Sequence, residues 1–352
     1  MKIALITDTH WGVRNDSHIF LDANKKFLDD VFFPKLAEER IERVIHLGDL
    51  VDRRKYINFN TAARLRQDFL EPLRHVSVDI IAGNHDTYYK NTNEVNALRE
   101  LARDYVNIQI HDQYPCEMKY DGLPILLLPW ICDQNRQETM NAIKNTRAQV
   151  AMGHLELQGF EMYRGSMVSH GDDPRVFDRF DLVCSGHYHH RSSSGNIHYL
   201  GSHAEFTWSD YDDPKGFHIF DTNTRELEFV VNPYKMFEKI FYSDASMKVE
   251  DIAEIDFQAY TGMCLKVIIK NKTNPYLFDM FIDRLEKVNP ADMQIVEDHL
   301  NLGLVDDEEI VDEAEDTLTI FRKYVNNMTT DINKEKLNKT ISDVYAEALE
   351  LK

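Results

Sequence analysis

The side chains best suited to chemistry follow short apolar runs that have the length and composition of strands. Residues 76–82 are rich in β-branched side chains and too short for a buried helix, and Gly83-Asn84-His85-Asp86 follows directly. Residues 2–7 likewise lead into Asp8-Thr9-His10, and residues 43–47 lead into Gly48-Asp49. Because ligands in open α/β sheets bind beyond the carboxyl ends of the strands, we expect these segments to meet at one edge.

One such junction alone would signal little, since Asp and Gly-Asn also open ordinary turns and cap helices. Two later runs strengthen the pattern, because residues 148–152 lead into Gly153-His154 and residues 180–184 lead into a histidine-rich segment from 185 to 190. Five predicted strand ends therefore deliver carboxylate, amide and imidazole groups, and the candidates are Asp8, His10, Asp49, Asn84, His85, His154, His187 and His189.

Oxygen and imidazole donors without a thiolate favour manganese, iron or zinc over a closed structural zinc site. A single ion would not use so many ligands. Two ions roughly 3.5 to 4 Å apart, with one carboxylate bridging them, can generate a hydroxide and stabilise both the entering and the leaving oxygen of a phosphate ester. The residue types therefore predict hydrolysis of a phosphate ester at a two-metal centre.

The elements that must position these residues alternate between strand and helix, which predicts an α/β fold with a helix-covered sheet. Helical periodicity indicates helices at 16–40, with a kink at Pro34, at 59–74 and at 93–103, followed by a strand at 106–110. Farther along, strands are expected at 116–120 and 124–128 and a helix at 134–145. We expect residues 197–200, 216–221 and 226–231 to complete a second sheet.

From residue 232 the pattern indicates a separate small α/β unit, with strands at 239–242, 264–270 and 294–296 and a helix at 276–288. An acidic stretch and one or two amphipathic helices follow. The expected organisation is a catalytic domain at 1–231, a small α/β capping domain at 232–304, an acidic linker at 305–316 and a helical segment at 317–352.

Composition sets limits on function. The chain has 352 residues and a formal net charge of −20, which argues against coating of nucleic acid by bulk electrostatics, so any nucleic-acid contact must use a local patch. No apolar run reaches the roughly 18 residues of a membrane span, and the N-terminus enters a strand with no sign of a signal peptide. The four cysteines lack Cys-x-x-Cys spacing, which fits a reducing cytoplasm; they are Cys116, Cys132, Cys184 and Cys264.

In order along the chain, five segments resemble the five motifs of the calcineurin-like metallophosphoesterases: Asp8-x-His10, Gly48-Asp49-x-x-Asp52, Gly83-Asn84-His85-Asp86, Gly153-His154 and Gly186-His187-x-His189. The resemblance implies a two-sheet αββα sandwich. Within that superfamily the chain is similar to the SbcD-type DNA-repair nucleases, and especially to their phage recombination-endonuclease relatives. Weaker support comes from Trp11-Gly12, Leu128-Pro129-Trp130 and the segment from Asp213 to Phe217.

Carried over by motif, the resemblance implies one metal ion on Asp8, His10 and His189, a second on Asn84, His154 and His187, and a bridge through Asp49. His85 would face the scissile phosphate as transition-state stabiliser and proton donor. Asp86 would orient His85 or a loop amide. Two divalent ions are implied, with Mn²⁺ expected first and Mg²⁺ as the alternative. Gly201-Ser202-His203 departs from the Gly-Ser/Thr-Pro of many relatives, which bears on the loop and not on the metal site.

The resemblance implies a DNA nuclease, acting as a double-strand exonuclease and a single-strand endonuclease, with an SMC-like coiled-coil ATPase in DNA recombination and double-strand-break processing. The capping domain would bind DNA, and residues 317–352 are expected to dock the ATPase, since their apolar faces follow a charged segment. The compartment would be the cytoplasm, that of the host if the chain is phage-encoded.

A homodimer is expected through the helices after the second and third motifs, where relatives pair and where apolar residues are expected to exceed what a sheet covers. These residues are Phe59, Ala63, Leu65, Phe69, Leu70, Val95, Leu98, Leu101 and Ala102. Arg53, Arg54 and Lys55 are candidates for a DNA-backbone contact or a solvated loop. His46 and Trp130 are expected in the core, while four histidines match no ligand position: His170, His190, His198 and His203.

Two other interpretations remain open. A stand-alone phosphodiesterase or protein phosphatase of the same superfamily would act on small molecules or phosphoproteins, and it would need neither the small domain nor the acidic linker. A scaffold that has kept the fold and lost the chemistry predicts missing ligands, and none of the motif ligands is missing.

Overall fold

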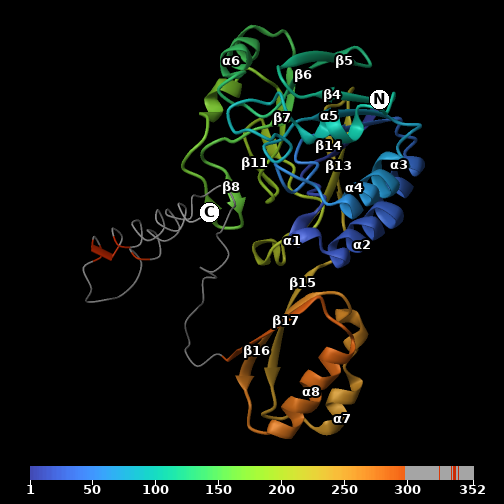
Figure 1. The fold of residues 1–352 in the computed structure, drawn as a ribbon, viewed down its shortest axis with the longest axis vertical. Helices are drawn as coiled ribbons and strands as arrows, with labels where there is room; N and C mark the ends of the chain where they lie inside the picture. The colour runs from blue at the N-terminus through green and yellow to red at the C-terminus, as the bar shows by residue number, and fades with distance from the viewer. Residues whose placement is uncertain (298–324, 326–333, 335, 338–339, 341–352) are drawn as a thin grey trace. The chain divides into compact units, whose positions relative to one another are not determined.

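The computed structural model describes residues 1–297, 325, 334, 336, 337 and 340, and two six-stranded sheets form its core (Figure 1). The first sheet has the order β14 (Leu227–Val231), β13 (Gly216–Asp221), β1 (Lys2–Ile6), β2 (Arg43–His46), β3 (Ser77–Ile81) and β4 (Ile108–His111). The second has the order β11 (Ser192–Ser194), β12 (Ile197–Tyr199), β10 (Leu182–Gly186), β7 (Val150–His154), β6 (Leu123–Leu128) and β5 (Cys116–Tyr120). Strands β1 to β4 are parallel, as are β6, β7, β10 and β12.

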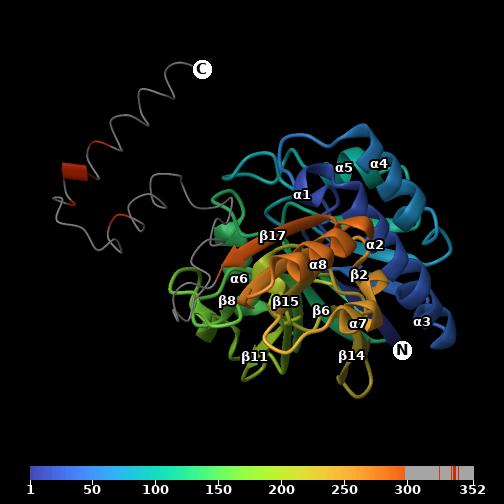
Figure 2. The same cartoon turned by 90° about the horizontal axis from the view of Figure 1, so that it is seen from below.

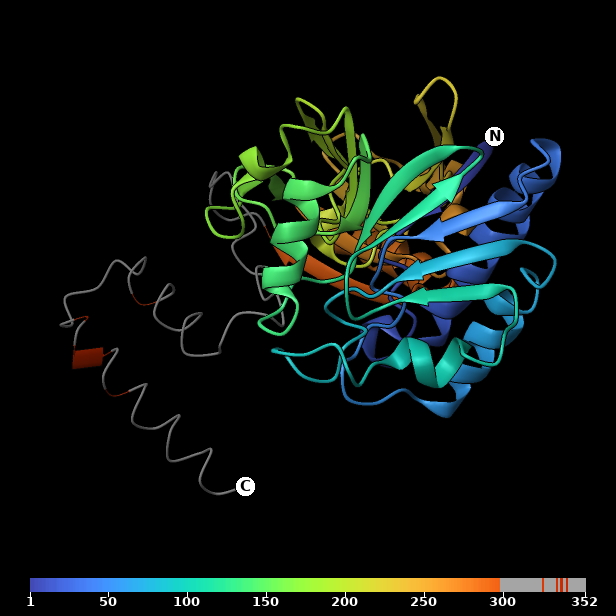
Figure 3. The ribbon, with the colours of Figure 1, turned by 90° about the horizontal axis from the view of Figure 1, so that it is seen from above.

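The two sheets stack face to face. One buried cluster draws side chains from both of them, including Leu5 of the first and Leu127 of the second. Two further clusters pack helices on the outer faces: α2 (His18–Phe27), α3 (Phe33–Glu38), α4 (Phe59–Leu65) and α5 (Ala97–Ala102) on the first sheet, and α6 (Arg136–Asn145) on the second. Figure 3 shows α6 and the blue helices on opposite outer sides of the strands. The predicted αββα sandwich is confirmed.

The placement of residues 216–221 and 226–231 in the second sheet is wrong. β13 pairs antiparallel with β1, with His218 opposite Leu5, and β14 extends the first sheet beyond β13. Apolar alternation identifies a strand but does not say which sheet edge it joins. The parallel run from β1 to β4 leaves one edge of β1 free, and the chain returns from the second sheet to cover that edge.

Two expected helices contain wider π-helical turns. In residues 16–40, α2 ends at Phe27, a π turn covers Leu28–Phe32, and α3 begins at Phe33 with Pro34 in its first turn. Proline lacks an N–H donor, so the regular hydrogen-bond pattern is interrupted near the expected kink. In residues 59–74, α4 ends at Leu65 and a π turn covers Arg66–Leu70.

Several short elements were not predicted, because they span too few residues to show a hydrophobic periodicity. They are α1 (Val13–Asp16), β8 (Glu161–Tyr163), β9 (Ser166–Met167) and the 3₁₀ turns Pro174–Phe177, Trp208–Asp210 and Phe257–Tyr260. The helix expected at 93–103 begins only at Ala97, where the Asn96 side chain caps it. Within the part of the chain that the structure describes, no helix is long and apolar enough to cross a lipid bilayer.

A third, smaller sheet follows the sandwich. Its three parallel strands have the order β15 (Phe237–Ser243), β16 (Cys264–Asn271) and β17 (Asp292–Glu297), and helices α7 (Val249–Glu254) and α8 (Pro275–Lys287) connect them (Figure 2). Tyr242, Leu265 and Phe281 belong to the buried cluster of this unit. The domain limits 1–231 and 232–304 stay predictions. Residues 305–316, and nearly all of 317–352, lie outside the described residues.

The small sheet is attached to the sandwich at the start of β15. The Glu205 carboxylate accepts hydrogen bonds from the main-chain N–H groups of Met236 at 2.7 Å and Phe237 at 3.0 Å. The Phe237 ring packs against Phe20 of α2 and against Trp208. Burial raises the pKa of Glu205 to about 7. The small unit is therefore anchored to the loop that follows β12.

Most apolar residues expected at a dimer surface are covered within the chain. Leu65, Phe69, Leu70, Leu98, Leu101 and Ala102 are buried against the outer face of the first sheet, so for them the expected excess of apolar surface is wrong. Phe59, with 93% of its surface exposed, and Val95, with 49% exposed, remain uncovered in the described chain.

Candidate metal centre

Five strand ends converge at one edge of the sandwich. Three of them belong to the first sheet (β1, β2 and β3) and two to the second (β7 and β10). The loops after β1 and β2 are held together by main-chain bonds, because Asp8 N–H donates to the Gly48 carbonyl and His10 N–H donates to the Asp49 carbonyl. The structure thus brings together all eight sequence-predicted candidates, Asp8, His10, Asp49, Asn84, His85, His154, His187 and His189.

Two glycines allow this convergence. A Cβ atom on Gly83 would collide with the Asp49 carboxylate and main-chain nitrogen. One on Gly48, whose φ is +100°, would collide with the His154 ring and would also need a left-handed backbone. Both glycines are therefore required for the loops to approach each other.

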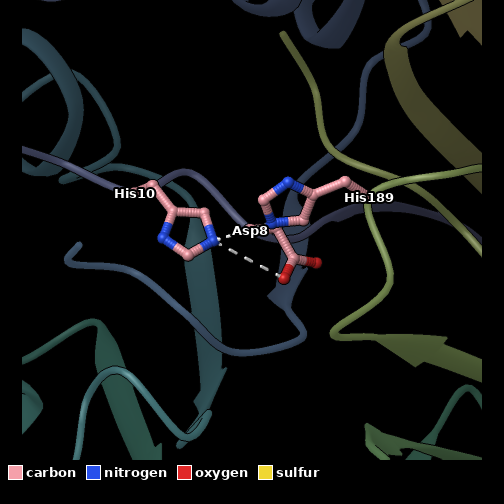
Figure 4. Close-up of side chains that lie close together, drawn as sticks. All are labelled: Asp8, His10 and His189. Atoms are coloured by element: carbon pink, nitrogen blue, oxygen red, sulfur yellow. Dashed lines mark hydrogen bonds and ion pairs between the residues drawn. The ribbon is translucent and has the colours of Figure 1, made fainter. Parts of the chain in front are cut away.

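The first cluster consists of Asp8, His10 and His189 (Figure 4). The Nε2 atoms of His10 and His189 lie 3.0 Å apart. The Asp8 Oδ1 atom lies 3.9 Å from His10 Nε2. All three side chains point toward a common position, and His10 and Asp8 are almost completely buried.

The second cluster is centred on Asn84. Its Oδ1 atom lies 3.0 Å from His154 Nε2 and 3.0 Å from His187 Nδ1. The other nitrogen of His154, Nδ1, lies 2.8 Å from the carbonyl of Leu47, which accepts its proton, so Nε2 carries the lone pair when the ring is neutral. An amide oxygen and two imidazole nitrogens therefore face one another.

Asp49 lies between the two clusters. Its Oδ2 atom is 3.8 Å from His10 Nε2 of the first cluster and 3.3 Å from His154 Nε2 of the second. Its Oδ1 atom accepts a hydrogen bond of 2.8 Å from the main-chain N–H of His85. The carboxylate is thus placed where one residue can serve both clusters.

The donor set fits two metal ions. Ligand atoms bound at about 2.1 Å and at right angles to one another lie about 3 Å apart, which is the separation of the two Nε2 atoms of His10 and His189. Three ring nitrogens in these clusters are buried without a hydrogen-bond partner, namely His10 Nδ1, His187 Nε2 and His189 Nδ1. The atoms that face the metal positions are different ones. His10 Nε2 meets His189 Nε2, and Asn84 Oδ1 meets a nitrogen of His154 and one of His187, so a cation at each position would offset the repulsion between their lone pairs.

The local field also favours positive charge. Burial by itself would lower the pKa of His10, but Asp52, Asp49 and Asp8 outweigh it and raise this pKa to about 9. Burial would likewise lower the pKa of His154, and Asp49 raises it to about 9. The Asp49 carboxyl, despite its burial, has a pKa well below its usual value because of the surrounding histidines. The carboxylates of Asp8, Asp49 and Asp52 therefore act together to stabilise positive charge at this edge of the sandwich.

His85 is oriented through its main chain and its Nδ1 atom. Nδ1 lies 2.5 Å from the carbonyl of Asp52, which accepts its proton. The ring stands edge-on to His10, with centroids 4.9 Å apart. Within the described residues no hydrogen bond engages Nε2, so this atom is available to a substrate.

Asp86 holds the loops and does not contact His85 through its side chain. Its Oδ1 accepts from the N–H groups of Leu50 at 2.9 Å and Val51 at 3.2 Å, and its Oδ2 accepts from Gly83 N–H at 2.8 Å. Burial, followed by the Asp49 charge, raises the pKa of Asp86 to about 7. Of the two roles expected for it, the hydrogen bonds fit the orientation of loop amides, which is a positioning role.

Sequence reasoning missed Lys215 as a support of the site. Its ammonium is buried and lies 2.7 Å from Asp210 and 2.9 Å from Asp213. It also donates to the main-chain carbonyl of His189 at 2.8 Å. The charged residues in the segment from Asp213 to Phe217 were a usable signal, because a buried lysine requires acidic partners.

The remaining predicted positions have mixed outcomes. His46 is fully buried and its Nε2 lies 2.9 Å from the Thr9 hydroxyl, which confirms the core interpretation. Trp130 is half-buried and lies at the site, with its ring centroid 5.2 Å from that of His187, so the expectation of a core residue is wrong. His203 is buried and its Nε2 lies 2.6 Å from Asn24 Oδ1. Hydrophobic periodicity cannot distinguish a tryptophan that lies at the edge of a site from one that lies in the core.

The basic triplet after the second motif is only partly available. Arg53 donates to Asp16 at 2.9 Å and to Asn15 at 2.7 Å, so its guanidinium is already engaged. Arg54 is half-buried, and Lys55 is exposed.

Fold and site together define a metal-dependent phosphoesterase. The sequence model of the family described as calcineurin-like phosphoesterase matches residues 1–191, more than half of the chain, and the chain belongs to this family. Its members use two metal ions, and the described residues include Asp/His clusters able to hold them. The protein is therefore a hydrolase of phosphate esters, and the resemblance inferred from the five motifs is confirmed.

Among characterised relatives, the chain is 33% identical over 360 residues to exonuclease subunit 1 of Enterobacteria phage T4, with 99% of each chain covered. It is 23% identical over 313 residues to a subunit of the nuclease SbcCD of Staphylococcus epidermidis, covering 80% of this chain and 79% of that protein. It is also 23% identical to the corresponding subunit of Staphylococcus saprophyticus, with 91% of this chain and 93% of that protein covered.

Proposed function

We propose that this protein is a DNA nuclease that hydrolyses phosphodiester bonds with two divalent metal ions, Mn²⁺ in preference to Mg²⁺. The observation that carries the proposal is the position of Asp49, whose Oδ2 atom lies 3.8 Å from His10 Nε2 and 3.3 Å from His154 Nε2. Similarity to the phage T4 exonuclease subunit over 99% of the chain supports DNA as the substrate.

In this proposal Asp8, His10 and His189 hold one ion, and Asn84, His154 and His187 hold the other, with Asp49 shared. When bound, the ions would supply a nucleophilic water and neutralise charge on the phosphate. The loops of this chain keep the ligands apart at the required spacing, through the Asp86 bonds to three amides and the Lys215 bond to the His189 carbonyl.

His85 acts as the proton donor to the leaving oxygen. Its Nδ1 proton is held by the Asp52 carbonyl, so the second proton of the imidazolium resides on Nε2, which would face the substrate. Transfer of that proton makes the departing DNA oxygen neutral. General acid groups of this type contribute roughly 10² to 10⁴-fold to a rate.

DNA contact needs a local basic surface, since the chain carries a net charge of −20. The small sheet offers one on the face opposite its buried cluster. Lys270 of β16 lies over the ring of Phe241, which is 61% exposed, whereas Lys239 and Lys266, paired across β15 and β16, are half-buried over the rings of Tyr211 and Trp208. Lysines next to an exposed aromatic ring suit a phosphate backbone and an unstacked base. Lys55 is the exposed member of the basic triplet and supplements this surface.

The partners proposed are an SMC-like coiled-coil ATPase and a second copy of this chain. Two relatives are named as subunits of the nuclease SbcCD, and this supports a partner subunit for this chain. Docking of the ATPase is assigned to residues 317–352, which lie outside the described residues except at isolated positions; Val325, one of these positions, is already buried. Phe59 and Val95, which are exposed on the outer face of the first sheet, are the residues that support a homodimer. Such a complex would work in the cytoplasm, where the DNA is.

The deciding experiment is cleavage of end-labelled duplex and single-stranded DNA with Mn²⁺ or Mg²⁺, with and without the ATPase. Metal-dependent shortening of DNA by the wild type and none by Asp49→Asn would support the proposal. Hydrolysis of a small chromogenic phosphodiester with no cleavage of any DNA would instead favour a stand-alone phosphodiesterase.

The assembly is tested separately. Removal of the residues after Val311 should abolish co-purification with the ATPase while Mn²⁺-dependent cleavage of short DNA continues. Full co-purification by the truncated chain would place the docking site elsewhere. A monomeric mass in sedimentation at micromolar concentration, with and without DNA or the ATPase, would contradict the homodimer.

A further inference from the structure

A second polar cluster, the β4–β5 cluster, lies where the edge strands β4 and β5 of the two sheets face each other, and it shares no residue with the metal centre. Asp79 of β3 is fully buried, and its carboxylate accepts from Arg43 Nη1 at 2.7 Å. The other Asp79 oxygen lies 2.8 Å from His111 Nε2. His111 Nδ1 lies 3.0 Å from the sulfur of Cys116, at the start of β5. A thiol, an imidazole and a carboxylate thus form a continuous chain.

This order of groups matches the requirement for an activated nucleophile. A nucleophilic side chain must contact a base, and the base must be oriented by a third group. Here the carboxylate fixes His111 through Nε2, so Nδ1 is directed at the Cys116 sulfur. The three residues come from three different strands, β3, β4 and β5, and the geometry therefore depends on the sandwich being folded.

The charges around the pair favour proton transfer from sulfur to imidazole. Burial by itself would lower the pKa of His111, but the hydrogen bonds to Asp79 and Cys116 outweigh it and raise this pKa to about 9. Two more titratable groups face the pair. The Arg43 guanidinium neutralises Asp79, and the buried Tyr120 hydroxyl faces Asp79 without a hydrogen bond of good geometry. An imidazolium next to a thiol favours the thiolate, the reactive form of cysteine.

The other three cysteines are more deeply buried than Cys116. Cys132 is 5% exposed, Cys184 is 0% exposed and Cys264 is 3% exposed, whereas Cys116 is half-buried. Burial raises the pKa of Cys184 to about 12, as expected for an inert core thiol. The molecule therefore carries its own internal controls.

We propose that Cys116 is a nucleophilic thiolate that is oxidised by hydroperoxides, with His111 as proton donor and Asp79 as the group that positions it. The sulfur attacks one peroxide oxygen, so an S–O bond forms as the O–O bond breaks. The departing oxygen, which is hydroxide from hydrogen peroxide or an alkoxide from an organic hydroperoxide, takes the proton from His111 Nδ1 and leaves as water or an alcohol. Sulfur is oxidised to a sulfenic acid and the peroxide is reduced, so atoms and charge balance.

The first experiment needs no variant. The full chain is treated with iodoacetamide at pH 6 and at pH 8, native and in urea, and each cysteine is followed by peptide mass spectrometry. An ordinary thiol with a pKa of about 8.5 reacts roughly 75-fold more slowly at pH 6 than at pH 8. The alkylation rate of native Cys116 should fall clearly less between pH 8 and pH 6 than that of urea-unfolded Cys116, which should show the full loss. Equal losses in the two states would overturn the proposal.

The second experiment tests the named chemistry. Hydrogen peroxide with dimedone present should place the dimedone adduct on Cys116 before any other cysteine. His111→Gln, checked for folding by circular dichroism, should slow labelling of Cys116 at pH 6 by at least tenfold. Tyr120→Phe, which leaves the three-residue chain intact, is the matched control and should label at the wild-type rate. Labelling of Cys116 by peroxide that is unchanged in His111→Gln, or first labelling at one of the buried cysteines, would contradict the assignment.

Discussion

The molecule contains two histidine clusters, and the difference between them lies in how their polar atoms face one another. At the metal centre like atoms meet, as in the 3.0 Å approach of His10 Nε2 to His189 Nε2, and three ring nitrogens are buried without partners. In the β4–β5 cluster donors and acceptors alternate, from Arg43 to Asp79 and from His111 to Cys116. The first cluster brings lone pairs together and needs cations, whereas the second is linked by hydrogen bonds from Arg43 through Asp79 and His111 to Cys116.

This contrast distinguishes a site that needs a bound ion from a network whose groups hydrogen-bond to one another. Buried polar groups of a stable interior are normally hydrogen-bonded, and groups that are not indicate a missing ion or ligand. The same amino acid therefore has opposite meanings at the two places. Removal of a neutral His10 ring from the metal-free protein takes away an Nε2 atom that faces another imidazole nitrogen, whereas removal of His111 takes away one of the two hydrogen-bond partners of buried Asp79.

Loss of the shared carboxylate should have the largest effect. Asp49→Asn removes a negative charge that lies beside both clusters, so both ions should bind weakly and DNA hydrolysis should fall by at least about 10³-fold, equivalent to several kcal/mol of charge stabilisation. The measurement is cleavage of labelled duplex with Mn²⁺, together with metal content by mass spectrometry. Retention of two ions and of activity would show that Asp49 does not join the clusters.

His85→Gln should lower turnover while leaving the metal content intact. His85 lies beside the clusters, but its Nδ1 bonds the Asp52 carbonyl and its Nε2 is free for substrate. The expected loss in kcat is about 10² to 10⁴-fold. A chromogenic substrate with a good leaving group needs no proton donor and should lose much less, which provides the control. Loss of both ions in this variant would place His85 among the metal ligands.

Much of the metal centre could be predicted from the sequence, because parallel strands force their carboxyl ends to one edge. Asp8, Asp49 and Asn84 needed only three strand assignments to be grouped. The histidines His154 and His187 required the further knowledge that a second sheet faces the first, which the five motifs supplied. The predicted bounds of these strands differ from the observed ones by a residue or two, and this does not change which side chains meet.

What the sequence did not predict depends on contacts between distant strands. Asp79, His111 and Cys116 have no characteristic spacing, and each separately resembles an ordinary strand residue. Lys215 reaches the His189 carbonyl only because β13 returns to the first sheet, the strand placement that sequence patterns missed. Local periodicity carries no information on which edge a late strand joins, so the groups that such a strand positions are missed as well.

Addition of metal ions should stabilise one cluster and not the other. At a free Mn²⁺ concentration about 100 times the dissociation constant, binding adds about 2.7 kcal/mol per site to the free energy of unfolding. We expect thermal unfolding to shift upward with Mn²⁺, and a chelator to reverse the shift. His111→Gln should show the same shift as the wild type. Loss of the upward shift in His111→Gln would mean that the β4–β5 cluster also binds the metal.

The smallest effect compares the two histidines directly in metal-free protein. His111→Leu removes a partner of buried Asp79 and should cost about 1–3 kcal/mol of unfolding free energy, the usual penalty for a buried group left under-bonded. Above the raised His10 pKa of about 9, where the ring is neutral and no longer pairs with Asp52, Asp49 and Asp8, His10→Leu removes an Nε2 atom that faces another imidazole nitrogen, so it should cost at most about half as much. Urea unfolding with a chelator present gives both values under the same conditions. With Mn²⁺ restored the order should reverse, because only His10→Leu forfeits metal stabilisation. If His10→Leu is already the more damaging change without metal, the metal centre is held together by its own hydrogen bonds, and the contrast between the two clusters fails.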